Sequence, residues 1–133
     1  MTPPDPTGYG RVISSNGQVT AIIEHKDATP EQREQERECN VGVYCFCGGR
    51  LTANIDLLGN DNVQGEYYIT DMVGLYVSKG EPVAAVHVDD YKEALGVNSR
   101  FELAVATRIM QERINEHWMS QGVTMLDPTS VWI

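Results

Sequence analysis

Hydrophobic and polar positions alternate near the start of the chain, on either side of a short polar break. The alternation covers residues 11–15 and 18–24, and the break between them is Asn16-Gly17. Asn-Gly supplies the positive φ angles of a tight turn, so the pattern predicts a β-hairpin. In its second strand one face carries Val19, Ala21 and Ile23, and the other carries Thr20, Ile22 and Glu24. Because both faces carry apolar residues, we expect the strand to be covered on each side.

Continuous apolar runs and helical spacings predict the remaining elements. The runs at 41–47 and 82–88 are typical of buried strands, and 123–126 predicts a shorter one. A short exposed helix is expected within 27–38. Further helices are expected over 48–59, 66–80 and 99–121, where glycines supply the C-terminal stops. A hairpin followed by alternating strands and helices indicates a mixed α/β domain, with a mixed sheet flanked by helices.

Helix starts carry suitable polar residues. Thr29 and Gln32 form a capping box, with Pro30 in the first helical position. Ser99 and Glu102 form a second box at the start of the longest helix. The apolar stripe of that helix is expected to comprise Phe101, Val105, Ile109, Met110, Ile114 and Trp118.

Length, charge and cysteine count narrow the possible classes of protein. The chain has 133 residues, which favours one domain, and a formal net charge of −9. Because no basic cluster occurs, we expect neither nucleic acid nor a membrane as partner. A signal peptide and a membrane-spanning run are not recognised, so a cytoplasmic location is expected. The odd set Cys39, Cys45 and Cys47 predicts free thiols packed in the core, in preference to a zinc site that would need a fourth ligand.

Polar residues at the predicted strand ends have both structural and functional interpretations. Gly8-Tyr9-Gly10 forms either a simple bend or a close backbone approach to a ligand. Glu24 is either a solvated strand end or an acceptor for sugar hydroxyls. Asn40 either caps the backbone or contacts a ligand, because ligands gather at strand ends in α/β sheets.

Two further positions lie at predicted helix starts. Of the consecutive Tyr67 and Tyr68, only one can face the core, which leaves the other for a cleft. Asn98 is either part of a helix cap or an oxygen ligand of Mg²⁺, which would also need carboxylates or phosphates. His87 and His117 have no partner that indicates a catalytic triad.

The order of the polar motifs carries a family resemblance. The segments are "DPTGYGRV", "EHKDAT", "ECNVGVY", "NDNVQGEYYITD", "LGVNSR" and "GVTMLDP". From about Asp5 onward the chain resembles the bacterial bifunctional N-acetylglucosamine-1-phosphate uridyltransferase/glucosamine-1-phosphate acetyltransferase. The resemblance implies part of a Rossmann-like nucleotide-diphospho-sugar transferase domain. It also implies a Mg²⁺-dependent reaction of UTP with N-acetylglucosamine-1-phosphate that yields UDP-N-acetylglucosamine (UDP-GlcNAc) for the cell wall.

The same resemblance assigns roles to individual residues. It implies a sugar-binding backbone amide at Gly10, beside Tyr9, and a carboxylate for sugar hydroxyls at Glu24. Asn40 would contact the amino sugar, and Tyr68 and Thr70 would lie around its acetamido group. Asn98 would bind Mg²⁺ and the nucleotide diphosphate. No residue of this chain is assigned a catalytic role.

The family pattern has parts with no counterpart in this sequence. These parts are a glycine-rich phosphate loop with its basic residue, a metal-binding aspartate and the base pocket, so the Mg²⁺ site would be incomplete. Residues 34–38 also form a loop one residue longer than the family pattern. Residues 1–126 would be the C-terminal, sugar-binding half of the nucleotidyltransferase domain. Residues 127–133 would begin a linker to a left-handed β-helix domain. The full-length proteins of this family assemble as trimers.

Three hypotheses follow for the function. The chain is a uridyltransferase fragment inactive alone, a non-catalytic sugar-phosphate-binding or structural module, or part of a sister enzyme acting on glucose-1-phosphate. The "EYYITD" and "GVN" segments favour the first over the third. Because an interrupted sheet exposes strand edges, we also expect a homo-oligomer formed through strand exchange.

Overall fold

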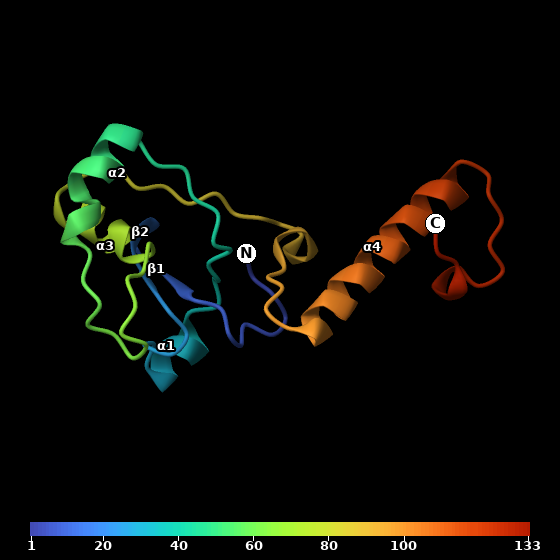
Figure 1. Cartoon of the computed structure of the whole chain (residues 1–133), viewed down its shortest axis with the longest axis horizontal. Helices are drawn as coiled ribbons and strands as arrows, with labels where there is room; N and C mark the ends of the chain where they lie inside the picture. Colours follow the sequence, from blue (N-terminus) through green and yellow to red (C-terminus); the bar gives the residue numbers. More distant parts are fainter. The chain divides into compact units, whose positions relative to one another are not determined.

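The computed structural model describes residues 1–133. The chain is α/β and divides into two compact units, Met1–Tyr91 and Lys92–Ile133. The elements of the first unit are β1 (Arg11–Ser15), β2 (Gln18–Ile23), α1 (Pro30–Gln35), α2 (Gly48–Asn54), η1 (Ile55–Leu57) and α3 (Asp71–Ser78). The short helix η2 (Tyr91–Ala94) lies at the boundary, and the second unit contains α4 (Arg100–Ser120) and η3 (Pro128–Ser130) (Figure 1).

The predicted hairpin is confirmed. β1 and β2 pair antiparallel from Arg11 opposite Ile23 to Ser15 opposite Gln18. At the turn, Asn16 has a φ of 52° and Gly17 a φ of 77°, as a primed turn requires. β2 ends at Ile23, so Glu24 is the first residue beyond the strand.

The core of the first unit forms where α3 packs against β2 (Figure 1). The apolar spacing predicted the residues that α3 buries, which are Met72, Val73 and Tyr76. The helix begins at Asp71, later than the expected 66, and Ile69 is 37% exposed. Gly80 follows the helix with a φ of 70°, which confirms the predicted stop.

The predicted caps are confirmed, one of them in altered form. At α1 the Thr29 hydroxyl accepts from the Gln32 backbone N–H at 3.2 Å, and the Gln32 side chain accepts from the Thr29 N–H at 2.9 Å. At α4 the Ser99 hydroxyl accepts from the Glu102 N–H at 3.1 Å. The Glu102 carboxylate instead accepts from the Asn98 N–H, at 2.7 Å.

The predicted strands at 41–47, 82–88 and 123–126 are wrong for this chain. The sheet contains β1 and β2 only, with an isolated bridge between Arg11 and Cys39. A strand requires a neighbouring backbone to satisfy its N–H and C=O groups, and none pairs with these segments. Several of their apolar residues are therefore exposed, with Val43 at 80% and Val86 at 90%.

The expected burial of Cys45 and Cys47 is wrong for the same reason, because both lie in an unpaired segment and are exposed. All the cysteines are free thiols, as expected, and Cys39 alone is buried, at 1% exposure. Its pKa is raised by burial, although the nearby Arg11 charge acts in the opposite direction. Only Cys39 of the three predicted core thiols lies in the core.

The expected apolar stripe of α4 is also wrong, because the residues that the helix buries are polar. Gln111 is 6% exposed and Asn115 is 0% exposed, whereas Phe101 is 77% exposed. The Asn115 amide donates to the carbonyl oxygens of Pro128 (2.6 Å) and Val131 (2.9 Å). The Gln111 amide donates to those of Thr129 (3.0 Å) and Val131 (2.7 Å). The two amides thus fasten the C-terminal segment to the helix. None of the helices combines the length and apolar content needed to cross a membrane.

Candidate functional site

Gly10 and Glu24 face each other just outside the hairpin. Arg11 pairs with Ile23, so the residues on their outer sides are the next to come together. A Cβ atom on Gly10 would lie 3.2 Å from Oε2 of Glu24 and 3.3 Å from the Ile23 carbonyl oxygen. Glycine therefore allows the backbone to approach the carboxylate more closely than another residue would.

Thr70 holds the other oxygen of the Glu24 carboxylate. Its hydroxyl donates to Oε1 of Glu24 at 3.1 Å, and the residue is only 4% exposed. Thr70 is the N-cap of α3, so the packing of this helix on the hairpin carries the hydroxyl to the carboxylate. This hydrogen bond links residues 46 positions apart in the chain.

The backbone of Asn40 contacts Gly10 on the side away from Glu24. Its backbone N–H donates to the Gly10 carbonyl oxygen at 2.9 Å, and the Val12 N–H donates to the Glu38 carbonyl oxygen, also at 2.9 Å. The side-chain oxygen of Asn40 accepts from the Gly42 N–H at 3.1 Å, and its amide NH₂ group lies near the Tyr44 phenol. The structure therefore brings Gly10, Glu24, Asn40 and Thr70 together.

Arg11 supports the loop that carries Gly10, and sequence reasoning missed it. The side chain is 1% exposed, and its Nη1 donates to the Pro6 carbonyl oxygen at 2.9 Å and to that of Tyr9. These contacts hold the Gly8-Tyr9-Gly10 bend over a buried guanidinium group. An arginine directly before the apolar pair Val12-Ile13 in a predicted strand was the available sequence signal, because such a residue is rarely buried without partners.

Tyr68 lies among acidic side chains at the edge of the group. Burial raises the pKa of its phenol, and the charges of Asp27, Glu66 and Glu24 add to this effect. Burial also raises the pKa of Asp71, and the charge of Asp27 adds to it. Asp27 itself accepts from the Val63 N–H at 2.8 Å, which ties the polar loop before α3 to the end of the hairpin. Sequence reasoning did not single out Asp27 or Asp71.

Asn98 lies in the second unit, and its backbone N–H donates to Glu102. The structure thus assigns Asn98 to the start of α4. No group of three or more His, Cys, Asp or Glu side chains is arranged to hold a metal ion. Mg²⁺ requires several oxygen ligands, and Asn98 offers one neutral amide oxygen.

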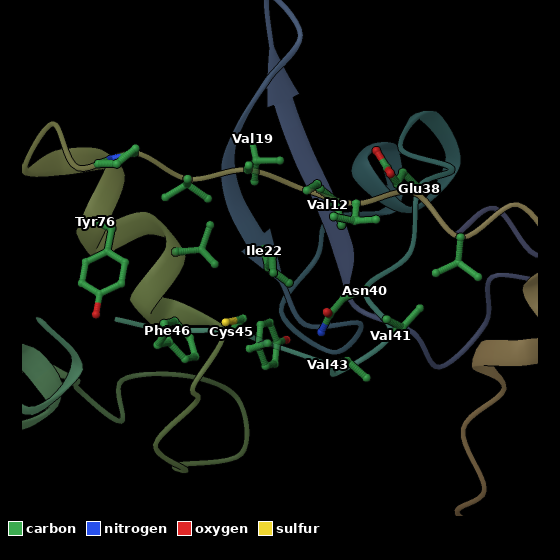
Figure 2. A pocket seen from close by; sticks show the side chains of 18 of the residues that line it. Val12, Val19, Ile22, Glu38, Asn40, Val41, Val43, Cys45, Phe46 and Tyr76 are labelled. Atoms are coloured by element: carbon green, nitrogen blue, oxygen red, sulfur yellow. The ribbon is translucent and has the colours of Figure 1, made fainter. Parts of the chain in front are cut away.

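A cavity of about 560 Å³ lies beside the hairpin, and Asn40 reaches its wall (Figure 2). Most of the lining is apolar, including Val12 and Ile22 from the hairpin and the unpaired segments 41–47 and 82–88. Gly10, Glu24 and Thr70 do not line it. Tyr44, another residue that sequence reasoning missed, also lines the cavity, and burial raises the pKa of its phenol while the Asn40 side chain opposes this.

Nearly the whole chain aligns with curated proteins called bifunctional protein GlmU. The relative from Limosilactobacillus reuteri is 47% identical over 131 residues, which is 98% of this chain. The relative from Bacillus subtilis is 48% identical over 130 residues (97% of this chain), and that from Alkalilimnicola ehrlichii is 52% identical over 126 residues (94%). Over this stretch the chain belongs to the GlmU family. This result confirms the resemblance drawn from the ordered motifs.

The chain spans only part of a GlmU protein. It covers 29% of the length of the Limosilactobacillus relative, 28% of the Bacillus one and 27% of the Alkalilimnicola one. No family model matches the chain. Within this GlmU segment, Glu24 with Gly10 and Thr70 forms a polar group that lies outside the apolar cavity.

Proposed function

We propose that this chain provides the sugar-binding part of a GlmU uridyltransferase domain. In the proposed reaction, the phosphate of N-acetylglucosamine-1-phosphate attacks the α-phosphorus of UTP, pyrophosphate leaves and UDP-GlcNAc forms. The observation that carries the proposal is the Glu24 carboxylate held between the Gly10 backbone and the Thr70 hydroxyl. A carboxylate held in this way is ready to accept hydrogen bonds from sugar hydroxyls without first reorganising.

The neighbouring residues have proposed roles around the same sugar. Gly10 contributes its backbone, and Asn40 contributes an amide NH₂ group to the amino sugar. Tyr9 and Tyr68 bound the pocket, with Tyr68 and Thr70 on the acetamido side. All these residues bind and orient the substrate, which matters because phosphoryl-type transfer depends mainly on positioning.

The nucleotide side of the reaction is proposed to lie in a Rossmann-like sheet beyond these residues. Asn98 is the proposed ligand of Mg²⁺ and of the nucleotide diphosphate, and magnesium would neutralise phosphate charge when bound. Because we propose that this chain carries only part of the magnesium site, we expect it to release no pyrophosphate above background from UTP and N-acetylglucosamine-1-phosphate. Turnover near that of a full-length GlmU relative would overturn this expectation.

Calorimetry or ligand-observed NMR with N-acetylglucosamine-1-phosphate tests the sugar site directly. We expect the chain to bind this sugar phosphate, and Glu24→Ala to weaken binding at least about tenfold, because the group that accepts the sugar hydroxyls is lost. Glu34→Ala is the matched control, since Glu34 is an exposed carboxylate on α1, and its affinity should equal that of the wild type.

The possible outcomes separate the hypotheses. If the wild-type chain binds no sugar phosphate, or if Glu24→Ala binds as well as the wild type, the proposed site is wrong. Glucose-1-phosphate serves as the comparison ligand, because equal or tighter binding of it would favour a sister sugar-1-phosphate nucleotidyltransferase.

A further inference from the structure

The turn that follows β2 carries two carboxylates, those of Glu24 and Asp27. The turn is closed on itself, because the N–H groups of Asp27 and of the next residue both donate to the Glu24 carbonyl oxygen at 3.0 Å. The Glu24 carboxylate accepts from the Thr70 hydroxyl at 3.1 Å, and Oδ1 of Asp27 accepts from the Val63 N–H at 2.8 Å. One turn therefore holds both ends of the segment 63–70.

The polar loop, residues 60–66, is ordered by hydrogen bonds within itself. Oδ1 of Asn62 accepts from two backbone N–H groups of the loop, at 3.1 and 3.2 Å. The Asn62 carbonyl oxygen accepts from a third at 3.1 Å. A loop closed by its own asparagine in this way moves as one piece. The hydrogen bond from Val63 to Asp27 therefore positions the whole polar loop, and not Val63 alone.

Tyr68 lies between the two attachment points, with its phenol beside Asp27. The charge of Asp27 raises the pKa of the phenol, after the larger effect of burial, so the two groups are close and the phenol is protonated at neutral pH. Oδ2 of Asp27 and the Tyr68 hydroxyl oxygen are both shielded from solvent, and no third group forms a hydrogen bond with either. Asp27 thus has one oxygen on the polar loop and a second, buried oxygen that can accept from the Tyr68 hydroxyl.

We propose that Asp27 is a positioning residue that makes the sugar site selective for an N-acetylated sugar. It holds the polar loop and Tyr68 against the turn that carries Glu24, and so fixes the wall of the site on the acetamido side. The inference rests on the proposed function, in which Tyr68 lies on that side. Glucose-1-phosphate has a hydroxyl in place of the acetamido group. A displaced wall therefore costs the N-acetylated ligand more contacts than it costs glucose-1-phosphate.

Calorimetry of this chain with both sugar phosphates tests the selectivity. We expect Asp27→Ala to lower the preference for N-acetylglucosamine-1-phosphate over glucose-1-phosphate, as a ratio of dissociation constants, at least about fivefold, which is the effect of roughly one hydrogen bond. Asp27→Asn keeps an oxygen for the Val63 N–H and should retain most of the preference. Asp56→Ala is the matched control, because Asp56 is an exposed aspartate of η1, and it should keep the wild-type ratio.

Amide hydrogen exchange, measured by NMR without ligand, tests the attachment of the polar loop. We expect the Val63 N–H to exchange at least about tenfold faster in Asp27→Ala than in the wild type, because its hydrogen bond is lost. In Asp27→Asn and Asp56→Ala it should exchange at nearly the wild-type rate. Amides within α4 should exchange alike in all four proteins, which shows that each is folded.

Three results would overturn the positioning role and leave the proposed function intact. The first is an Asp27→Ala protein with the wild-type ratio of dissociation constants, even if both affinities fall together. The second is unchanged exchange of the Val63 N–H in Asp27→Ala. The third is a preference as low in Asp27→Asn as in Asp27→Ala, which would make the charge, and not the attachment, responsible. A wild-type chain that binds neither sugar phosphate would instead refute the proposed function, and the selectivity with it.

Discussion

Gly10 illustrates how one residue without a side chain defines the candidate site. The alternation of the hairpin placed Glu24 at a strand end but left its environment open, with solvent as one alternative. The structure places its carboxylate against Gly10 and under the Thr70 hydroxyl. The partner of Glu24 could not be derived from the hairpin pattern, because Thr70 reaches it only after α3 has packed on β2.

Replacing Gly10 by alanine tests the close approach. A Cβ atom 3.2 Å from Oε2 of Glu24 must displace the carboxylate or the strand end, so Gly10→Ala should lower the free energy of unfolding by about 1–3 kcal/mol. Urea denaturation measures the change. Gly48→Ala is the control, because Gly48 begins α2 with no atom within 4 Å of its Cβ position, and it should be neutral or slightly stabilising. Equal effects of the two substitutions would contradict the close contact between a Cβ atom on Gly10 and the Glu24 carboxylate.

At the scale of elements, locally determined features were predicted well. The Asn16-Gly17 turn, the Thr29 cap, and the glycines that end α3 and α4 depend on a few neighbouring residues. Elements that depend on distant segments were predicted poorly, because the apolar runs at 41–47 and 82–88 have strand composition but no backbone partner. Burial along α4 likewise depends on which segment covers the helix. Gln111 and Asn115 are buried because their amides bind carbonyl oxygens of the C-terminal segment.

Acid should weaken the start of α4. The pKa of Glu102 is lowered by hydrogen bonds from the Asn98 backbone and the Ser99 side chain, so its carboxylate stabilises the folded helix. For a lowered pKa, this stabilisation is fully present above the ordinary value of 4.5 and is lost as the pH falls through the folded-state value.

Far-UV circular dichroism of Glu102→Gln checks this pH dependence. We expect the variant to be less stable than the wild type at neutral pH, and the difference to disappear in acid. Glu116→Gln, an exposed position farther along α4, should follow the wild type at every pH. A constant difference between Glu102→Gln and the wild type from neutral to acid pH would exclude the carboxylate as the cause.

On the scale of the whole molecule, charge and apolar exposure act in opposite directions. The net charge of −9 disfavours the approach of a second copy, whereas exposed apolar residues such as Val43, Val86 and Leu126 favour it. Which effect prevails depends on ionic strength, because salt screens exposed charges and leaves apolar pairing intact. The Debye length falls from about 30 Å at 0.01 M salt to about 8 Å at 0.15 M.

Self-association should therefore strengthen with salt. We expect the average mass measured by sedimentation to rise as sodium chloride is raised from low to physiological concentration. Val86→Lys, which replaces an exposed apolar residue by a charged one, should associate less than the wild type throughout the series. Association that weakens with salt would indicate contacts held by ion pairs and would contradict this expectation.

The sequence by itself determined the α/β class, the hairpin, the helix caps and, through its ordered motifs, the relation to GlmU. Each of these depends on neighbouring residues or on the motifs themselves. Only the tertiary structure decided which predicted strands find a partner, which residues of α4 are buried, and which polar residues surround Glu24. Those outcomes depend on contacts between distant segments, because a backbone pairs only with what lies beside it and a side chain is buried only by what covers it.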